Sequence, residues 1–225
     1  LKPEFNKDAE FVGRFQREAE AASRMTHHNI VNLLDVGMDG ENRYLIMEYV
    51  KGKTLKEVIQ EKGRLSPAVA VQITIRILSA LQHAHQNGII HRDIKPHNIF
   101  VSRDGHFKLG DFGIAKTVEK TMGGTKIGTY KYMAPEVYHN RPYGSAADVY
   151  SLGLVLYWML NRRCGPFLPL PPTVPTASQM ENAKERRFGG EQLPPPVNGS
   201  QALKQIVLRA CAFDPAQRYT TPEEL

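Results

Sequence analysis

Residues 90–113 read I-H-R-D-I-K-P-H-N-I-F-V-S-R-D-G-H-F-K-L-G-D-F-G and carry the most informative pattern in the chain. Two short strand-like runs, Ile99–Val101 and His106–Leu109, flank the dipeptide Asp104-Gly105. Asp-Gly is a favoured two-residue hairpin turn because these residues tolerate the positive φ that such a turn requires. The sequence therefore predicts a β-hairpin that turns at this dipeptide.

The register of that hairpin brings polar side chains together at its open end. A turn at Asp104-Gly105 places Asn98 opposite Asp111, so that an amide and a carboxylate meet across the strands. Asp93 lies on the loop that leads into the same end. Oxygen ligands of this kind suit Mg²⁺, which binds few protein groups and shares its other positions with waters and phosphates.

Together with Lys95, these residues predict phosphoryl transfer. Asn98 and Asp111 would hold the metal, while Asp93 would orient a hydroxyl group and accept its proton. Lys95 would balance the charge on the transferred group. A polar hairpin with a solvated, charged loop is the simpler interpretation for any one of these residues, but it does not account for the whole set in this order.

Composition favours a mildly basic, cytoplasmic enzyme. The chain has 225 residues, of which 41% are hydrophobic, and this suits one large domain or two small ones. Its two cysteines, Cys164 and Cys211, have no metal-type spacing, which indicates a reducing compartment. The net charge is +6, but no run of Lys or Arg exceeds two residues, so we expect no nucleic-acid partner. The most apolar stretch, Val149–Leu160, is too short to cross a bilayer, and no membrane contact is expected in these residues.

The chain around this segment is predicted to be mainly helical. Capping signals begin three helices, at Thr54 with Glu57, at Ser66-Pro67 and at Ser200. Further helices are expected at Phe11–Ala22, Val149–Leu160 and Ala177–Phe188, and strands at Leu33–Val36 and Tyr44–Met47.

Two motifs resemble the catalytic loop and the metal-binding loop of protein kinases: His91-Arg92-Asp93-x-Lys95-x-x-Asn98 and Asp111-Phe112-Gly113. The run Gly128-Thr129-x-x-Tyr132-Met133-Ala134-Pro135-Glu136 resembles the end of the kinase activation segment. The resemblance covers nearly the whole chain. It implies an α+β, two-lobed fold with an incomplete small antiparallel-sheet lobe at 1–50 and a mainly helical large lobe at 51–225.

The resemblance also assigns an ATP site in the small lobe and at the lobe boundary. Phe15–Ala19 is similar to the helix whose glutamate, here Glu18, pairs with a strand lysine. That lysine and the glycine-rich loop do not occur in these residues and would lie upstream of Leu1. Backbone groups of Glu48 and Val50 would bind adenine, and Met47 would guard the back of the pocket.

Further roles follow from the same resemblance. Thr121 and Thr125 are the candidates for phosphorylation, and Arg92 would bind the phosphate. Thr129 would contact Asp93 and Lys95 and is therefore a site residue. The structural contacts implied are those of Asp148 with the backbone at His91 and Arg92, and of Arg218 with Glu136.

The expected function is a serine/threonine protein kinase that transfers the γ-phosphoryl group of ATP, with Mg²⁺ or Mn²⁺, to protein hydroxyls. Lys95 together with Thr129 indicates Ser/Thr substrates, and the style of the motifs is closest to the eukaryotic-like kinases of bacteria.

A homodimer would permit trans-autophosphorylation, and the full-length protein could be anchored in the cell membrane. Without the upstream strands, residues 1–225 are expected to be nearly inactive. The alternatives are an inactive kinase-like scaffold and a small-molecule phosphotransferase.

Overall fold

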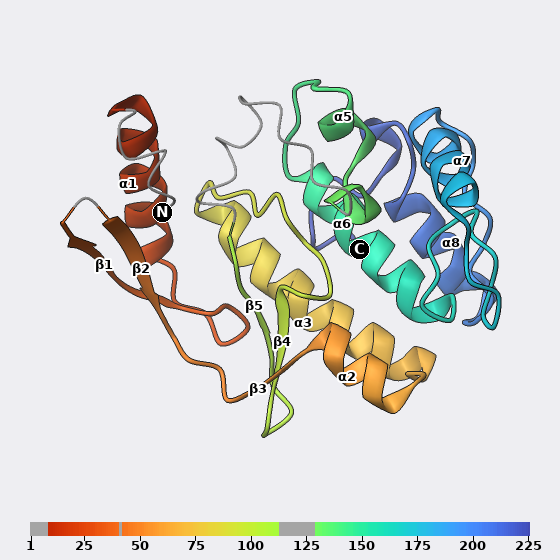
Figure 1. Ribbon diagram of the computed structural model, residues 1–225, viewed down its shortest axis with the longest axis horizontal. Coiled ribbons are helices and arrows are strands. Elements are labelled where there is room, and N and C mark those ends of the chain that lie inside the picture. The colour runs from red at the N-terminus through yellow and green to blue at the C-terminus, as the bar shows by residue number, and fades with distance from the viewer. Residues whose placement is uncertain (1–8, 41, 113–128) are drawn as a thin grey trace.

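The computed structural model describes residues 9–40, 42–112 and 129–225 (Figure 1). Helices α7 and α8 lie at the opposite end of the molecule from strands β1 and β2. The elements run in the order α1 (Ala9–Ser23), β1 (Leu33–Asp39), β2 (Asn42–Met47), β3 (Gly52–Thr54), α2 (Leu55–Lys62), α3 (Pro67–Gln86), β4 (Ile99–Ser102), β5 (Phe107–Leu109), η2 (Thr129–Tyr132), α5 (Pro135–Tyr138), α6 (Ala146–Leu160), α7 (Ala177–Phe188), α8 (Gln201–Ala210) and η3 (Pro215–Gln217).

The N-terminal part consists of α1 beside a two-stranded antiparallel sheet of β1 and β2. Phe15, Ala19 and Ala22 recur at helical spacing and are buried along one side of α1. The strands alternate poorly between buried and exposed positions, and apolar residues such as Leu34 and Met38 are more than 60% exposed, at 63% and 64%. This part is therefore thinly packed.

A three-stranded antiparallel sheet, in the order β3-β4-β5, supports the predicted hairpin. The hairpin exists, but its register differs by one residue from the prediction, because Ile99 pairs with Leu109. Of the two residues predicted to form the turn, only Gly105 has a positive φ, of 81°. A two-residue type I′ turn needs positive φ at both positions, so the chain uses a three-residue loop with a left-handed glycine instead.

The hydrogen bonds of the loop show this arrangement. The Gly105 N–H donates to the Ser102 carbonyl at 3.0 Å, and the Ser102 N–H donates to the His106 carbonyl at 2.9 Å. At the open end, the Gly110 N–H donates to the Asn98 carbonyl at 2.9 Å. The prediction that Asn98 faces Asp111 across the strands is therefore wrong by one position.

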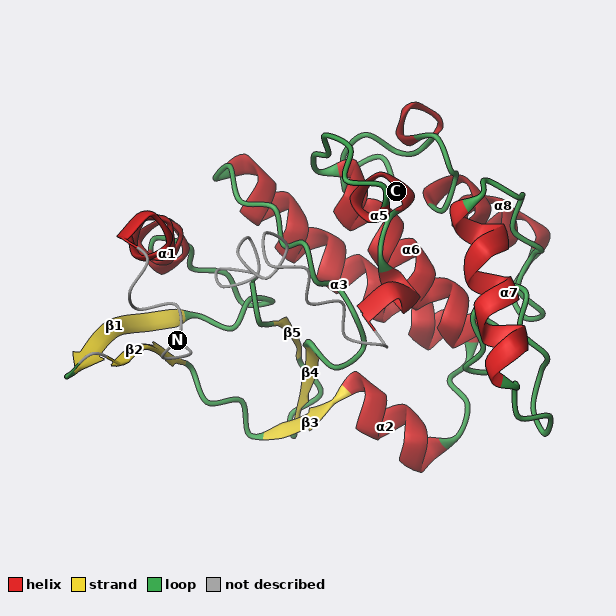
Figure 2. Cartoon of the chain, turned by 45° about the horizontal axis from the view of Figure 1, so that its top comes forward, coloured by secondary structure: helices red, strands yellow, loops and turns green. Residues whose placement is uncertain are grey.

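Helix α6 is the centre of the large helical part (Figure 2). Its residues are apolar on all sides and nearly all buried, as expected for a helix surrounded by others. Helices α3 and α8 pack against it, and α3 also covers β5. The helix begins at Ala146, three residues before the predicted start, and this places Asp148 in its first turn.

The capping signals mark the helix starts correctly. Thr54 and Glu57 form a reciprocal capping box at α2, and Ser66 and Ser200 accept backbone N–H groups at the starts of α3 and α8. The start of α7 carries a second capping box, from Thr176. These side chains satisfy backbone donors that have no partner inside the helix.

One main hydrophobic cluster runs from α1 to α8, and the mixture of helices and small antiparallel sheets confirms the predicted α+β class. Cys164 and Cys211 are both free and buried. Within the described ranges, none of the helices combines the length and apolar character needed to cross a membrane.

Candidate active site

Asp148 anchors the loop that follows α3. Its carboxylate accepts hydrogen bonds from the backbone N–H groups of His91, at 2.8 Å, and Arg92, at 2.9 Å, and from His85 Nε2 at 2.8 Å. Three donors satisfy a carboxylate that is only 1% exposed. The expected backbone contacts are present, and they hold Arg92 at a φ of 67°, in the left-handed region.

His91 ties this loop to the end of β5. Its Nδ1 accepts the Asp93 N–H at 3.2 Å, so Nε2 carries the proton and donates to the Gly110 carbonyl at 2.9 Å. The ring is completely buried and packs against Phe112, with centroids 4.6 Å apart. Burial lowers the pKa of His91, which favours the neutral ring that these two hydrogen bonds require.

Asp93, Lys95 and Asn98 converge as predicted. The Asp93 carboxylate accepts hydrogen bonds from Lys95 Nζ at 2.7 Å and from Asn98 Nδ2 at 2.8 Å. Asn98 Nδ2 also donates to the Asp93 carbonyl at 2.9 Å. Because the amide nitrogen of Asn98 is directed to Asp93, its Oδ1 remains the available acceptor.

Asp111 follows directly after the Asn98–Gly110 pair that closes the hairpin. Its side chain is exposed, and its φ is 55°, a left-handed conformation that is uncommon for any residue other than glycine. The negative charges of Asp93 and Asp111 both favour the protonated form of His91, but burial has the larger effect and lowers its pKa.

The donor set fits a hard divalent cation. An amide oxygen from Asn98 and a carboxylate from Asp111 are the ligand types that Mg²⁺ takes. In the described ranges no group of three or more His, Cys, Asp and Glu side chains is placed to hold a metal. Two protein ligands are sufficient where phosphates and waters supply the others.

Glu18 on α1 reaches the same loop. Its Oε1 lies 3.2 Å from Nη1 of Arg92, and both side chains are about one-third exposed, at 30% and 29%. In the structure the glutamate pairs with Arg92 of the loop that follows α3, a contact that the sequence did not predict. An ion pair of this exposure stabilises by no more than about 1 kcal/mol.

The segment after β2 leaves backbone groups available. The Glu48 N–H donates to the Asn32 carbonyl at 2.9 Å, and the Glu48 carboxylate pairs with Lys108 at 2.8 Å. Within the part of the chain that the structure describes, no hydrogen bond uses the Glu48 carbonyl or the Val50 N–H. Met47 ends β2 and is 44% exposed.

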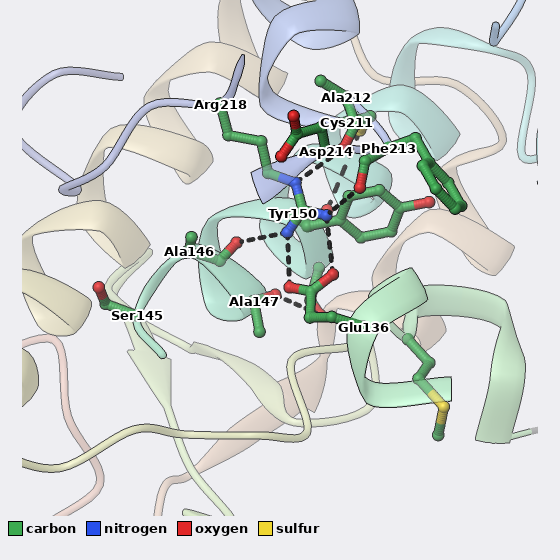
Figure 3. A network of polar contacts seen from close by, with 12 residues as sticks. Glu136, Ser145, Ala146, Ala147, Tyr150, Cys211, Ala212, Phe213, Asp214 and Arg218 are labelled. Carbon is green, nitrogen blue, oxygen red and sulfur yellow. Dashed lines mark hydrogen bonds and ion pairs between the residues drawn. The ribbon is translucent and has the colours of Figure 1, made fainter. Parts of the chain in front are cut away.

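A buried ion pair joins Arg218, the residue that follows η3, to Glu136 of α5 (Figure 3). Arg218 and Glu136 form two parallel hydrogen bonds, at 2.7 and 2.8 Å, and the guanidinium also donates to the carbonyls of Ala146, Ala212 and Phe213. It lies over the Tyr150 ring, 4.6 Å from the centroid. This is the pair expected from the sequence.

Two contacts of this region were not predicted from the sequence. His85 donates to Asp148, and Lys108 pairs with Glu48. Neither contact has a signal in the spacing, because each joins residues far apart in the chain. The predictions for Gly113, Thr121 and Thr125, and for the Thr129 side chain, lie outside the described residues.

Comparison of the sequence with known proteins identifies a family and several similar proteins. A family model described as the protein kinase domain matches residues 2–225. A "Probable serine/threonine-protein kinase" of Clostridium acetobutylicum is 40% identical over 100% of this chain and 34% of its own length. The serine/threonine-protein kinase PrkC of Bacillus subtilis is 37% identical over 100% of this chain and 34% of its own.

Comparison of the structure with solved structures also identifies a kinase domain. The Mycobacterium tuberculosis PknI kinase domain matches with a TM-score of 0.70 and 27% identity, covering 100% of this chain and 80% of that one. The chain spans about a third of the length of the curated relatives it matches.

Proposed function

This chain belongs to the protein kinase domain family, and from that membership we infer that it is the catalytic part of a serine/threonine protein kinase. The observation that carries this proposal is the Asp93 carboxylate, which Lys95 and Asn98 hold in one orientation. The loop that bears it is fixed by the buried Asp148. Catalysis by proximity and orientation requires a catalytic group that is held in a fixed position in this way.

In the proposed reaction, Asp93 orients the acceptor hydroxyl of a protein Ser or Thr and accepts its proton. Lys95 stays beside the transferred charge, and Thr129 adds a contact to this pair. ATP would supply the phosphoryl group. Asn98 Oδ1 and the Asp111 carboxylate would hold Mg²⁺ or Mn²⁺, which would neutralise negative charge on the phosphates.

The adenine ring would bind along the segment after β2. The Glu48 carbonyl would accept from the exocyclic amine and the Val50 N–H would donate to a ring nitrogen. Met47, at the end of β2, would border the ring. Residues 1–50 and 51–225 would then be the two lobes on either side of ATP.

Regulation would act through Arg92. A phosphate on Thr121 or Thr125 carries close to two negative charges and would compete with the single charge of Glu18 for this guanidinium. Autophosphorylation in trans would use a homodimer. We place the domain in the cytoplasm, and any membrane anchor would belong to other parts of the protein.

The test is phosphotransfer from radiolabelled ATP to a protein acceptor by the whole gene product that carries this chain. We expect label on serine and threonine. Asp93→Asn should reduce the rate by about 10²–10⁴-fold, the range for loss of a positioned general base. Asp104→Asn, in the exposed hairpin loop, is the matched control and should keep full activity.

Residues 1–225 alone should give little turnover, because the sequence contains neither a glycine-rich G-x-G-x-x-G loop nor a matching strand lysine. Equal labelling by the Asp93→Asn protein would overturn the assignment and leave a kinase-like scaffold. Label on a small molecule such as a sugar, with none on protein, would also overturn it.

A further inference from the structure

The surface is concave between α2 and the end of α6. The concavity is a pocket of about 280 Å³, here called the basic pocket, and it is lined by Lys56, Gln60, Trp158, Arg162, Arg163 and Pro171. Three of these side chains are cations, and none of the described residues that line it is an aspartate or a glutamate. A concave surface with one sign of charge concentrates ligands of the opposite charge.

The two arginines are presented by a rigid, unusual turn. Arg162 and Arg163 follow α6 directly and have φ values of 52° and 66°, both in the left-handed region. The Arg163 N–H donates to the Trp158 carbonyl at 3.0 Å. Buried Asn161 fixes the same turn through the Cys164 carbonyl and the Val197 N–H. Left-handed conformations in consecutive non-glycine residues cost free energy, and such outliers cluster at functional sites.

The basic pocket adjoins the catalytic loop. The Lys56 N–H donates to the carbonyl of Pro96, the residue after Lys95, at 3.1 Å. Pro96 lies three residues after Asp93 in the sequence. The side of the pocket that Lys56 forms therefore borders the catalytic loop.

We propose that the basic pocket binds an acidic or phosphorylated side chain of the protein substrate, close to the hydroxyl that receives the phosphoryl group. This proposal rests on the proposed kinase function. Paired arginines bind carboxylates and phosphates through charge-assisted hydrogen bonds, and Lys56 adds a point charge. The half-buried Trp158 supplies a flat apolar wall for the substrate backbone. A small pocket beside the catalytic loop suits one side chain of a peptide better than the extended backbone of a nucleic acid.

Trp158 gives a direct test, because it is the only tryptophan in the sequence. The 225-residue chain is titrated with serine peptides that differ only in flanking residues, either alanine, aspartate or phosphoserine, and the Trp158 emission is recorded. We expect the aspartate and phosphoserine peptides to bind at least about tenfold more tightly than the alanine peptide, the effect of one or two charge-assisted contacts. Added salt should weaken this difference.

Charge-removing variants locate the binding. The double variant Arg162→Asn with Arg163→Asn keeps residues that tolerate left-handed φ, and Lys56→Gln removes the third cation. Each should weaken binding of the acidic peptides by about tenfold or more, since each leaves the ligand anion short of a charged partner. Lys62→Gln, an exposed position on the same helix α2, is the matched control and should bind like the parent chain.

Turnover by the whole gene product separates the two proposals. The pocket variants should raise KM for the acidic peptides while kcat stays the same, because the pocket binds the substrate away from the reacting atoms. Equal affinity and equal KM for the alanine and aspartate peptides would overturn the basic-pocket proposal, even if kinase activity is robust. Tighter binding of single-stranded DNA or anionic vesicles than of any acidic peptide would overturn it as well. Absence of turnover together with pocket-dependent Trp158 titration would overturn only the kinase function.

Discussion

Asp148 and Arg218 are buried and can remain ionised because each makes several hydrogen bonds. Asp148 accepts three hydrogen bonds, and Arg218 donates to one carboxylate and three carbonyl groups. An ion without such partners would not remain charged in the interior. These residues therefore define positions where a neutral substitution leaves a partner unsatisfied.

The Arg218–Glu136 pair should be costly to break. Arg218→Met leaves the Glu136 carboxylate buried without its cation, and we expect a loss of about 3–5 kcal/mol in the free energy of unfolding. Lys53→Met, which breaks the half-exposed pair of Lys53 with Glu61, should cost no more than about 1 kcal/mol. Urea unfolding measures both values.

A double substitution checks the reason. Adding Glu136→Leu to Arg218→Met should recover part of the lost stability, because an apolar pair leaves no unpaired charge. If the double variant is no more stable than Arg218→Met, the unpaired Glu136 carboxylate does not account for the loss of stability.

His91 should make stability depend on pH. Its pKa is lowered in the folded protein, so below the unfolded value of about 6.5 the unfolded chain binds a proton that the folded ring does not. This contribution to stability is complete above that pH and is lost as the pH falls toward the folded pKa. His91→Gln should therefore show a shallower fall in the free energy of unfolding between pH 7.5 and 5.5.

The comparison isolates His91 because His27 and His97, whose pKa values are also lowered, remain in both proteins. Urea unfolding at several pH values gives the two curves. Parallel curves for the parent and His91→Gln would contradict the assignment of a neutral, buried imidazole.

For single residues, the sequence predicted the contacts that belong to a recognisable motif. It did not predict contacts between residues that share no motif. Spacing was enough for Asp93 with Lys95 and Asn98, and the family pattern was enough for Arg218 with Glu136. The pairing of Glu18 with Arg92 joins α1 to a loop more than seventy residues later, and only the packing of the whole chain determines such a contact.

At the scale of the element, the hairpin shows how local chemistry can be right and the register wrong. Asp-Gly marked the turn, but the three-residue loop places the left-handed residue only at Gly105. The short strand β3 was not predicted, because Gly52 and Lys53 have little β propensity. A Cβ on Gly52 would lie 2.0 Å from the Val101 carbonyl oxygen, so close backbone approach explains this glycine.

Gly105 should be sensitive to backbone conformation alone. A Cβ there meets no atom within 4 Å, so Gly105→Ala introduces strain at φ 81° without a clash. We expect a loss of about 1–2 kcal/mol in the free energy of unfolding, the cost of a left-handed alanine. Gly105→Asn should lose less, because asparagine tolerates this region, and urea midpoints compare the two. Equal losses would show that the loop does not require left-handed φ.

At the scale of the whole molecule, packing is uneven between the two ends. The two-stranded sheet of β1 and β2 exposes apolar side chains, whereas α6 is buried on nearly all sides. Isolated two-stranded sheets are marginally stable, and regions with few buried contacts open first.

Amide hydrogen exchange should reveal this difference. Amides of β1 and β2 should exchange through local opening, at least about 100-fold faster than those of α6, which need global unfolding. This factor corresponds to roughly 3 kcal/mol between the two opening reactions. Uniform protection across both regions would contradict a thinly packed N-terminal part.

The buried thiol of Cys211 has a practical consequence. Burial raises its pKa to about 12, and its side chain packs against Gly153 of α6. Alkylating reagents attack thiolates, so iodoacetamide at neutral pH has almost no nucleophile to react with while the helices stay together. The rate at which iodoacetamide modifies this cysteine therefore reports how often the packing between α6 and α8 opens.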